Sequence, residues 1–147
     1  DGARLDLAVH RCERAADALF DGASLGRLES EDPARLQVRL MPGSAALASA
    51  WPIATIHAAH RGADRDFSAA RAAIAARSGE SVLVVRDGWR AVVHRIDRPT
   101  FEWTRRLLDG ASLGDALDAA PPGFDFGAWL ADAVRARWLR DVVVRPD

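Results

Sequence analysis

The pattern of apolar and polar positions is clearest over residues 81–96, where two runs rich in β-branched residues flank Asp87-Gly88. Such runs are typical of strands, and an Asp-Gly pair suits a two-residue type I′ turn because both residues tolerate positive φ. The pattern therefore predicts a β-hairpin in which Val84 lies opposite Ala91.

Both faces of this predicted hairpin are apolar. Side chains alternate across a strand, which places Val82, Val84, Trp89, Ala91 and Val93 on one face and Leu83, Val85, Val92 and Ile96 on the other. A lone hairpin is not stable in water, so both faces need a cover. We expect helices to cover one face, and what borders the other face or its edge becomes the functional question.

Helical spacing of apolar residues predicts most of the remaining elements. The predicted helices cover residues 2–20, 52–61, 69–77, 97–109, 113–119 and 126–138, and the further extended segments are 36–40, 46–50 and 142–144. These elements predict an α+β fold with a small antiparallel sheet and helices packed on one face. The predicted division is an N-terminal helix within residues 1–22 and one α+β domain over residues 34–147.

Composition excludes several classes of function. The net charge of −1 over 147 residues gives no general attraction to nucleic acid or anionic membranes. Cys12, the one cysteine, excludes an internal disulfide and a cysteine-based zinc site within one chain. No apolar run reaches membrane-spanning length and no signal peptide opens the chain, so we expect a cytoplasmic protein without membrane association.

Candidate catalytic chemistry is sparse. His57 and His60 are three residues apart on a predicted helix, and a metal site there needs a third ligand, for which only Asp64 and Asp66 are near in sequence. Ordinary packed or surface histidines explain this pair better, so we predict no metal site. Nucleophile, dinucleotide-binding and Walker motifs are all absent from the sequence. We therefore expect no enzyme activity and no cofactor.

Three segments after residue 82 resemble a winged-helix unit of the PqqD type. They are Leu83-Val-Val-Arg86 on a strand, Leu107-Leu-Asp-Gly-Ala-Ser-Leu-Gly-Asp-Ala-Leu117 on a helix pair, and Phe126-Gly-Ala-Trp-Leu130 on the last helix. The resemblance implies a winged-helix C-terminal half that recognises a leader peptide in a pathway of ribosomal peptide modification.

A second resemblance covers nearly the whole chain. Five segments occur in the order found in the C-terminal part of the HvfC/BufC family, which often carries a DNA-binding-domain label: Ala3-Arg-Leu-Asp-Leu-Ala8, Leu36-Gln-Val-Arg-Leu-Met-Pro42, Ser49-Ala-Trp-Pro-Ile53, Val82-Leu-Val-Val-Arg86 and Gly110-Ala-Ser-Leu-Gly114. The resemblance implies a partner role beside an iron-dependent enzyme of the HvfB/BufB type, and that enzyme holds the iron ligands. Family members usually have a preceding helical domain, so the helix at 2–20 is interpreted as its end and the chain as a possible fragment.

The second hairpin strand and the third helix after it form the candidate peptide-binding site. An exposed strand edge offers N–H and C=O groups to which an extended precursor peptide adds as another strand. The expected contacts are Trp89, Arg90, Ala91, Val93 and Arg95 from the strand and Trp129, Ala133 and Arg137 from the helix. Arg90 and Arg95 would pair with acidic peptide residues. An interpretation of Trp129 and Val93 as core residues stays open.

The main alternative is a winged-helix transcription regulator that binds DNA. A winged helix places its second helix in the major groove, where phosphate contacts need clustered positive charge. The helix in that position carries Asp115 and Asp118 and no arginine, which disfavours nucleic acid, although Arg105 and Arg106 come just before it. A scaffold that only docks the enzyme is a third hypothesis.

Overall fold

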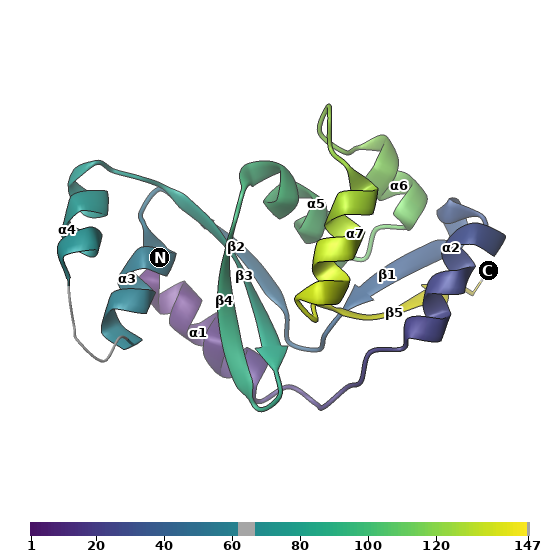
Figure 1. The fold of residues 1–147 in the computed structure, drawn as a ribbon, viewed down its shortest axis with the longest axis horizontal. Helices are drawn as coiled ribbons and strands as arrows, with labels where there is room; N and C mark the ends of the chain where they lie inside the picture. Colours follow the sequence, from purple (N-terminus) through teal and green to yellow (C-terminus); the bar gives the residue numbers. More distant parts are fainter. Residues whose placement is uncertain (62–66, 147) are drawn as a thin grey trace.

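The computed structural model describes residues 1–61 and 67–146, and its fold is α+β, which confirms the predicted class (Figure 1). The helices are α1 (Gly2–Glu13), α2 (Arg27–Ser30), α3 (Ile53–Arg61), α4 (Ser68–Ala75), α5 (Arg98–Leu108), α6 (Leu113–Asp118) and α7 (Phe126–Arg135). The strands are β1 (Leu36–Leu40), β2 (Ala45–Ser49), β3 (Glu80–Asp87), β4 (Arg90–Ile96) and β5 (Leu139–Val144). Short 3-10 turns lie at Gly22–Gly26 and Pro33–Arg35.

The strands form two antiparallel sheets instead of the one small sheet that was predicted. β2, β3 and β4 form a three-stranded sheet in that order, and β1 pairs with β5 in a two-stranded sheet. β1 leads into β2 through a short turn, so one stretch of chain passes from the first sheet to the second (Figure 1). The two sheets share the larger hydrophobic core, because Leu83 and Val85 of β3 pack in the same cluster as Leu36 and Val142.

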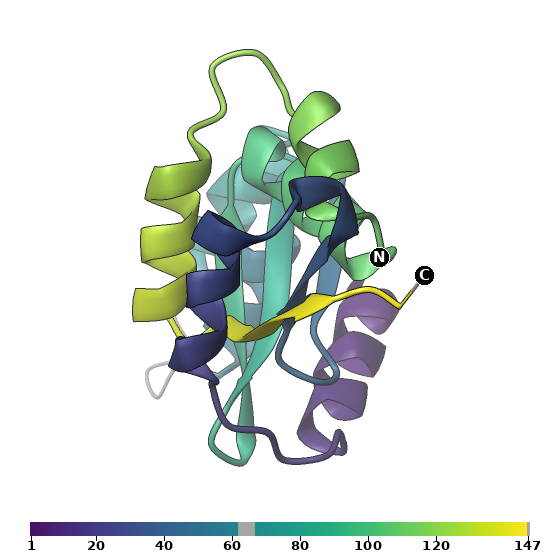
Figure 2. The same cartoon turned by 90° about the vertical axis from the view of Figure 1, so that its right-hand side faces the viewer.

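Helices cover both faces of the three-stranded sheet, so the prediction of helices on one face is wrong. On one face, Leu5 and Cys12 of α1 pack against Val82 and Val84 of β3. The opposite face packs against α5, whose Trp103 is fully buried. α1 and α7 lie on opposite sides of the sheets in Figure 2, where they are purple and yellow-green. Both faces of the hairpin are apolar, and burying both is the favourable arrangement.

The β3–β4 turn lies one residue further along the chain than predicted. Its central residues are Gly88 and Trp89, and Val84 pairs with Val93 instead of Ala91. Only Gly88 has a positive φ, +63°, which fits a type II′ turn with glycine at its first central position. The predicted type I′ turn is therefore wrong. The partner changes by two residues, so the assignment of side chains to the two faces is unchanged.

Helix α1 ends at Glu13, whereas the apolar spacing predicted a helix as far as residue 20. Arg86 of β3 holds the following segment in place. Its guanidinium donates a hydrogen bond to the Ala15 carbonyl oxygen and pairs with the Asp17 carboxylate at 2.7 Å. These tertiary contacts outweigh a weak helical periodicity, and residues 16–20 run without regular structure past the end of the hairpin.

Candidate functional site

β4 forms one edge of the three-stranded sheet, because β3 is its only strand partner among the described residues. In an antiparallel pair, residues that bond the partner strand alternate with residues whose N–H and C=O groups point away from it. The two-residue turn makes Asp87 and Arg90 a bonded pair, so the outward groups belong to Ala91, Val93 and Arg95. We call these three residues the β4 edge.

Helix α7 lies beside this edge, and the two elements border a groove. Near the end of β4, a cavity of about 440 Å³ is lined by residues of both elements, among them Arg95, Ala128 and Asp132. Near the start of β4, Arg137 follows α7 and pairs with Asp87 in the hairpin at 3.3 Å. α7 and the segment that follows it therefore approach the hairpin near both ends of β4.

Two of the helix residues predicted to contact a peptide are core residues instead. Trp129 is 4% exposed and Ala133 is 0% exposed, and both belong to the main hydrophobic core. The Trp129 ring packs edge-on against Trp103 at a centroid distance of 5.6 Å, because this face of α7 covers α5. The expectation that Trp129 and Ala133 form an open wall is therefore corrected. Ala128 and Asp132 are the exposed side chains on this wall, and neither was predicted.

The strand residues named from the sequence divide into two groups. Ala91 and Val93 are half-buried, because their side chains pack on the α1 cluster while their backbone groups stay at the edge. Trp89 is 70% exposed, and the guanidinium of the exposed Arg90 lies 4.1 Å from the centre of its ring. The β4 edge thus combines a row of outward-pointing backbone N–H and C=O groups with an exposed tryptophan ring at one end.

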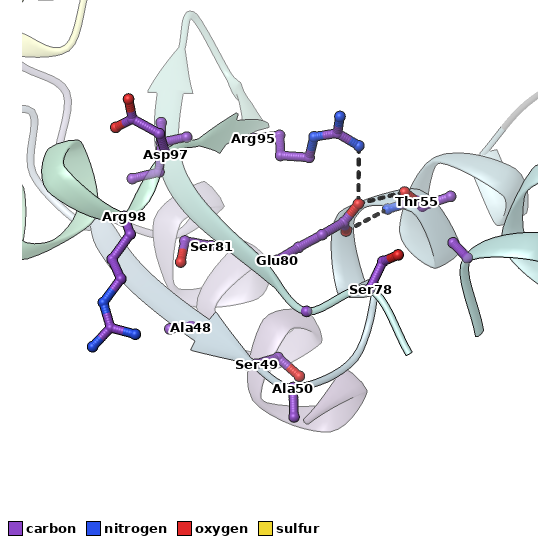
Figure 3. Close-up of a pocket in the computed structure, with 13 residues that line it drawn as sticks. Ala48, Ser49, Ala50, Thr55, Ser78, Glu80, Ser81, Arg95, Asp97 and Arg98 are labelled. Carbon is purple, nitrogen blue, oxygen red and sulfur yellow. Dashed lines mark hydrogen bonds and ion pairs between the residues drawn. The ribbon is translucent and has the colours of Figure 1, made fainter. Parts of the chain in front are cut away.

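Arg95, at the other end, is held by the carboxylate of Glu80. Glu80 opens β3, and its side chain is 7% exposed. Its Oε1 accepts hydrogen bonds from Thr55 Oγ1 at 2.6 Å and Arg95 Nη1 at 3.0 Å. Its Oε2 accepts from the N–H groups of Ala54 and Thr55 at 2.8 and 3.1 Å. Figure 3 shows the bonds from Thr55 and Arg95. The Arg95 side chain stays 67% exposed, so Glu80 fixes one nitrogen and leaves the rest of the guanidinium accessible.

The Glu80 carboxyl stays ionised because its hydrogen bonds outweigh its burial. Burial alone raises the pKa, whereas the bonds from Thr55, Ala54 and Arg95 lower it, and the resulting pKa is below the usual range. Glu80 was not among the residues predicted from the sequence. The available signal was an acidic residue at the start of an otherwise apolar strand, where burial demands a partner.

A recess of about 770 Å³ opens beside Arg95 at this end of the sheet. Its lining includes Arg95 from the end of β4 and Arg98 from the start of α5, together with the carboxylates of Glu80 and Asp97 (Figure 3). Guanidinium and hydroxyl groups donate hydrogen bonds to carboxylates. Arg98 is already paired with Glu102, and the Ser49 hydroxyl donates to Asp1. Glu80 and Asp97 also line the recess, so the exposed part of the Arg95 guanidinium is the group here that can bind an acidic ligand.

His94 of β4 faces α7 and packs on Trp138. The two rings meet edge-on at a centroid distance of 5.5 Å. Burial lowers the pKa of His94 below its ordinary value, although the nearby Asp87 acts in the opposite direction. The neutral imidazole is the form that this packing favours.

His60, one of the two histidines considered as metal ligands, has other contacts. His60 Nδ1 lies 2.8 Å from the carbonyl oxygen of Ile56, and its ring packs edge-on against Phe67. Asp64 and Asp66, the residues near enough in sequence to serve as a third ligand, lie outside the described residues. Within residues 1–61 and 67–146, no three metal-ligating side chains gather in one place.

Helix α6, the helix considered for DNA recognition, buries Leu113 and Ala116 and exposes Asp115 and Asp118. Its exposed surface is acidic, which is the opposite of what phosphate contacts need.

No family model matches this chain, and neither do the curated proteins or the solved structures with which it was compared. In the part of the chain that the structure describes, every helix is too short or too polar to cross a bilayer.

Proposed function

We propose that this chain is a non-catalytic accessory protein. It binds an extended ribosomal precursor peptide along the β4 edge and presents the peptide to an iron-dependent modifying enzyme of the HvfB/BufB type. The observation that carries the proposal is the unpaired backbone row of Ala91, Val93 and Arg95 beside α7. An added strand satisfies these groups, and side chains beside the edge supply sequence preference.

β4 is a better acceptor than β2, the opposite edge of the same sheet. β2 has five residues, all of them Ala, Leu or Ser, and α5 packs against it. β4 has seven residues, and Arg90 and Arg95 lie on it with their guanidinium groups exposed. The β4 edge thus combines the backbone row with arginines of its own strand, which suit an acidic leader.

The order of elements supports a PqqD-like unit. β3 and β4 form a hairpin, and α5, α6 and α7 follow it in the order that the resemblance implies. The enzyme partner rests on the HvfC/BufC-like segments of the sequence alone.

A proline substitution at the β4 edge tests whether the peptide binds there. Proline lacks an N–H and is tolerated on edge strands where that group faces solvent. The probe is a peptide of about twelve residues, selected from a random library on the wild-type chain and then synthesised. We expect Ala91→Pro to weaken its binding at least about tenfold, about 1.4 kcal/mol, because a donor is lost and the ring blocks the added strand.

Ala48→Pro is the matched control. Along β3, residues that hydrogen-bond β4 alternate with residues that hydrogen-bond β2. Ser81, the partner of Ala48, bonds β4, so the N–H of Ala48 points away from the sheet at the β2 edge. Ala48→Pro should leave peptide binding unchanged. A library that yields no binder, or a binder unaffected by Ala91→Pro, contradicts the proposal. Binding of duplex DNA with a steep salt dependence and no peptide binding favours the transcription regulator instead.

A further inference from the structure

The two most exposed large apolar side chains of the described residues, Leu19 and Trp89, lie with Phe20 beside the β3–β4 turn. Leu19 is 91% exposed, Trp89 is 70% exposed and Phe20 is 38% exposed. They are three of the seven large apolar side chains that the described residues expose. Single exposed apolar residues are ordinary, whereas a contiguous group of them marks an interaction surface.

These side chains line a pocket of about 770 Å³, which we call the turn pocket. Its apolar walls also include Met41 and Val134, and charged side chains stand at its rim. The rim is held by two ion pairs, Arg86 with Asp17 at 2.7 Å and Arg137 with Asp87 at 3.3 Å. The volume lies in the range of pockets that bind small ligands or side chains.

Arg137 is held at this pocket in an unfavourable backbone conformation. Its φ is +61°, in the left-handed region that favours glycine. It closes α7 with a Schellman pattern, since its N–H bonds the Val134 carbonyl oxygen and the Trp138 N–H bonds that of Ala133. Glycine would fit this position better, and an arginine there keeps a long side chain on the pocket wall.

The turn pocket lies at the end of the β4 edge, because Trp89 is the residue before β4 begins. A strand that pairs with Arg95, Val93 and Ala91 therefore reaches the pocket next. Trp89 lies six positions before Arg95, a separation of about 20 Å in an extended chain. Antiparallel pairing, the commoner mode, runs the added strand from Arg95 towards Trp89.

From this continuity we infer that the turn pocket binds a large apolar side chain of the captured peptide. That side chain lies about six residues C-terminal to an acidic residue that pairs with Arg95. The inference rests on the proposed function and adds the class of sequence that the site selects.

Designed peptides test the spacing and the direction. The probe is Glu-Thr-Val-Thr-Val-Thr-Phe with blocked ends and a fluorescent label, measured by anisotropy. We expect binding to fall at least about tenfold when Phe is replaced by Ser, because the pocket loses an apolar side chain. The reversed peptide Phe-Thr-Val-Thr-Val-Thr-Glu should also bind more weakly.

Paired substitutions in the protein test the pocket itself. Trp89→Ala should weaken the Phe peptide about tenfold, whereas Trp51→Ala, at another exposed tryptophan, should not. Arg137→Gly should weaken binding about fivefold without lowering the melting temperature. Arg77→Gly is its control, since Arg77 also closes a helix with a positive φ, +48°, away from the turn pocket. Arg77→Gly should affect stability in the same direction and leave binding unchanged.

The outcomes separate this inference from the proposed function. If library peptides bind the β4 edge but the Phe and Ser peptides bind equally, the turn pocket assignment is wrong and strand capture survives. The same holds if Trp89→Ala and Arg137→Gly leave the Phe peptide unaffected. If binding of the library peptides is insensitive to Ala91→Pro, strand capture itself is contradicted and this inference with it.

Discussion

Glu80 joins three parts of the sheet end through one carboxylate. It accepts hydrogen bonds from the first turn of α3, through Ala54 and Thr55, and from Arg95 at the end of β4. A buried carboxylate is costly unless it is paired, and this one has four hydrogen bonds. It therefore contributes to stability and positions the arginine that we expect to contact the peptide.

Glu80→Gln should destabilise the fold by about 1–3 kcal/mol at neutral pH, because an amide nitrogen cannot accept the bonds that a carboxylate oxygen accepts. Urea unfolding measures the change, and Glu102→Gln is the control, since Glu102 has a surface pair with Arg98. The folded-state pKa of Glu80 is lowered, so its contribution is present above the ordinary carboxyl pKa and is lost as the pH falls through the folded value. The difference between variant and wild type should therefore shrink in acid. Equal stability at neutral pH would show that the carboxylate is dispensable.

At the scale of elements, β4 combines an open edge with packed side chains. Ala91 and Val93 pack towards α1, and His94 packs on Trp138 towards the other core. The strand is therefore fixed on both faces while its edge stays free. A rigid edge loses little conformational entropy when a peptide adds to it.

His94 gives this strand a pH dependence. Burial lowers its folded-state pKa, so the neutral form stabilises the fold above the ordinary histidine pKa of about 6.5, and stability declines as the pH falls through the folded value. His94→Gln should reduce this decline when thermal unfolding is followed between pH 7 and 5. His57, whose pKa burial also lowers, should account for part of what remains. His10→Gln, at an exposed histidine, is the control, and an unchanged pH profile in His94→Gln would contradict the assignment.

The sequence predicted the elements better than their ends. The alternating runs over 81–96 located both hairpin strands, yet the turn is formed by Gly88-Trp89. A type II′ turn needs a positive φ only at its first central residue, here Gly88, whereas a type I′ turn needs it at both. Helical spacing likewise extended α1 past Glu13, since it holds no information about Arg86, which binds the following segment. Turn type and helix ends depend on local geometry and tertiary contacts that periodicity does not contain.

At the scale of the whole molecule, the pattern of apolar residues did not predict which strands pair with each other. Residues 36–40 were predicted as a strand, but their partner is β5, at the other end of the chain. Because β1 pairs with β5, it does not pair with β4, and the β4 edge stays free of it. The candidate site was predicted in part: the β4 residues and Arg137 border it, whereas Trp129 and Ala133 are core, because an apolar stripe on a helix does not reveal which neighbour buries it.

Peptide capture depends on the free edge of β4, and backbone amide hydrogen exchange measured by NMR tests this edge most directly. In the free protein, the amides of Ala91, Val93 and Arg95 should exchange fast, and those of Val92 and His94, which bond β3, should exchange slowly. Addition of a library-selected peptide should slow the three outward amides and leave the other two unchanged. Slow exchange at the three outward amides in the free protein, or no change when the peptide binds, would contradict strand capture at this edge.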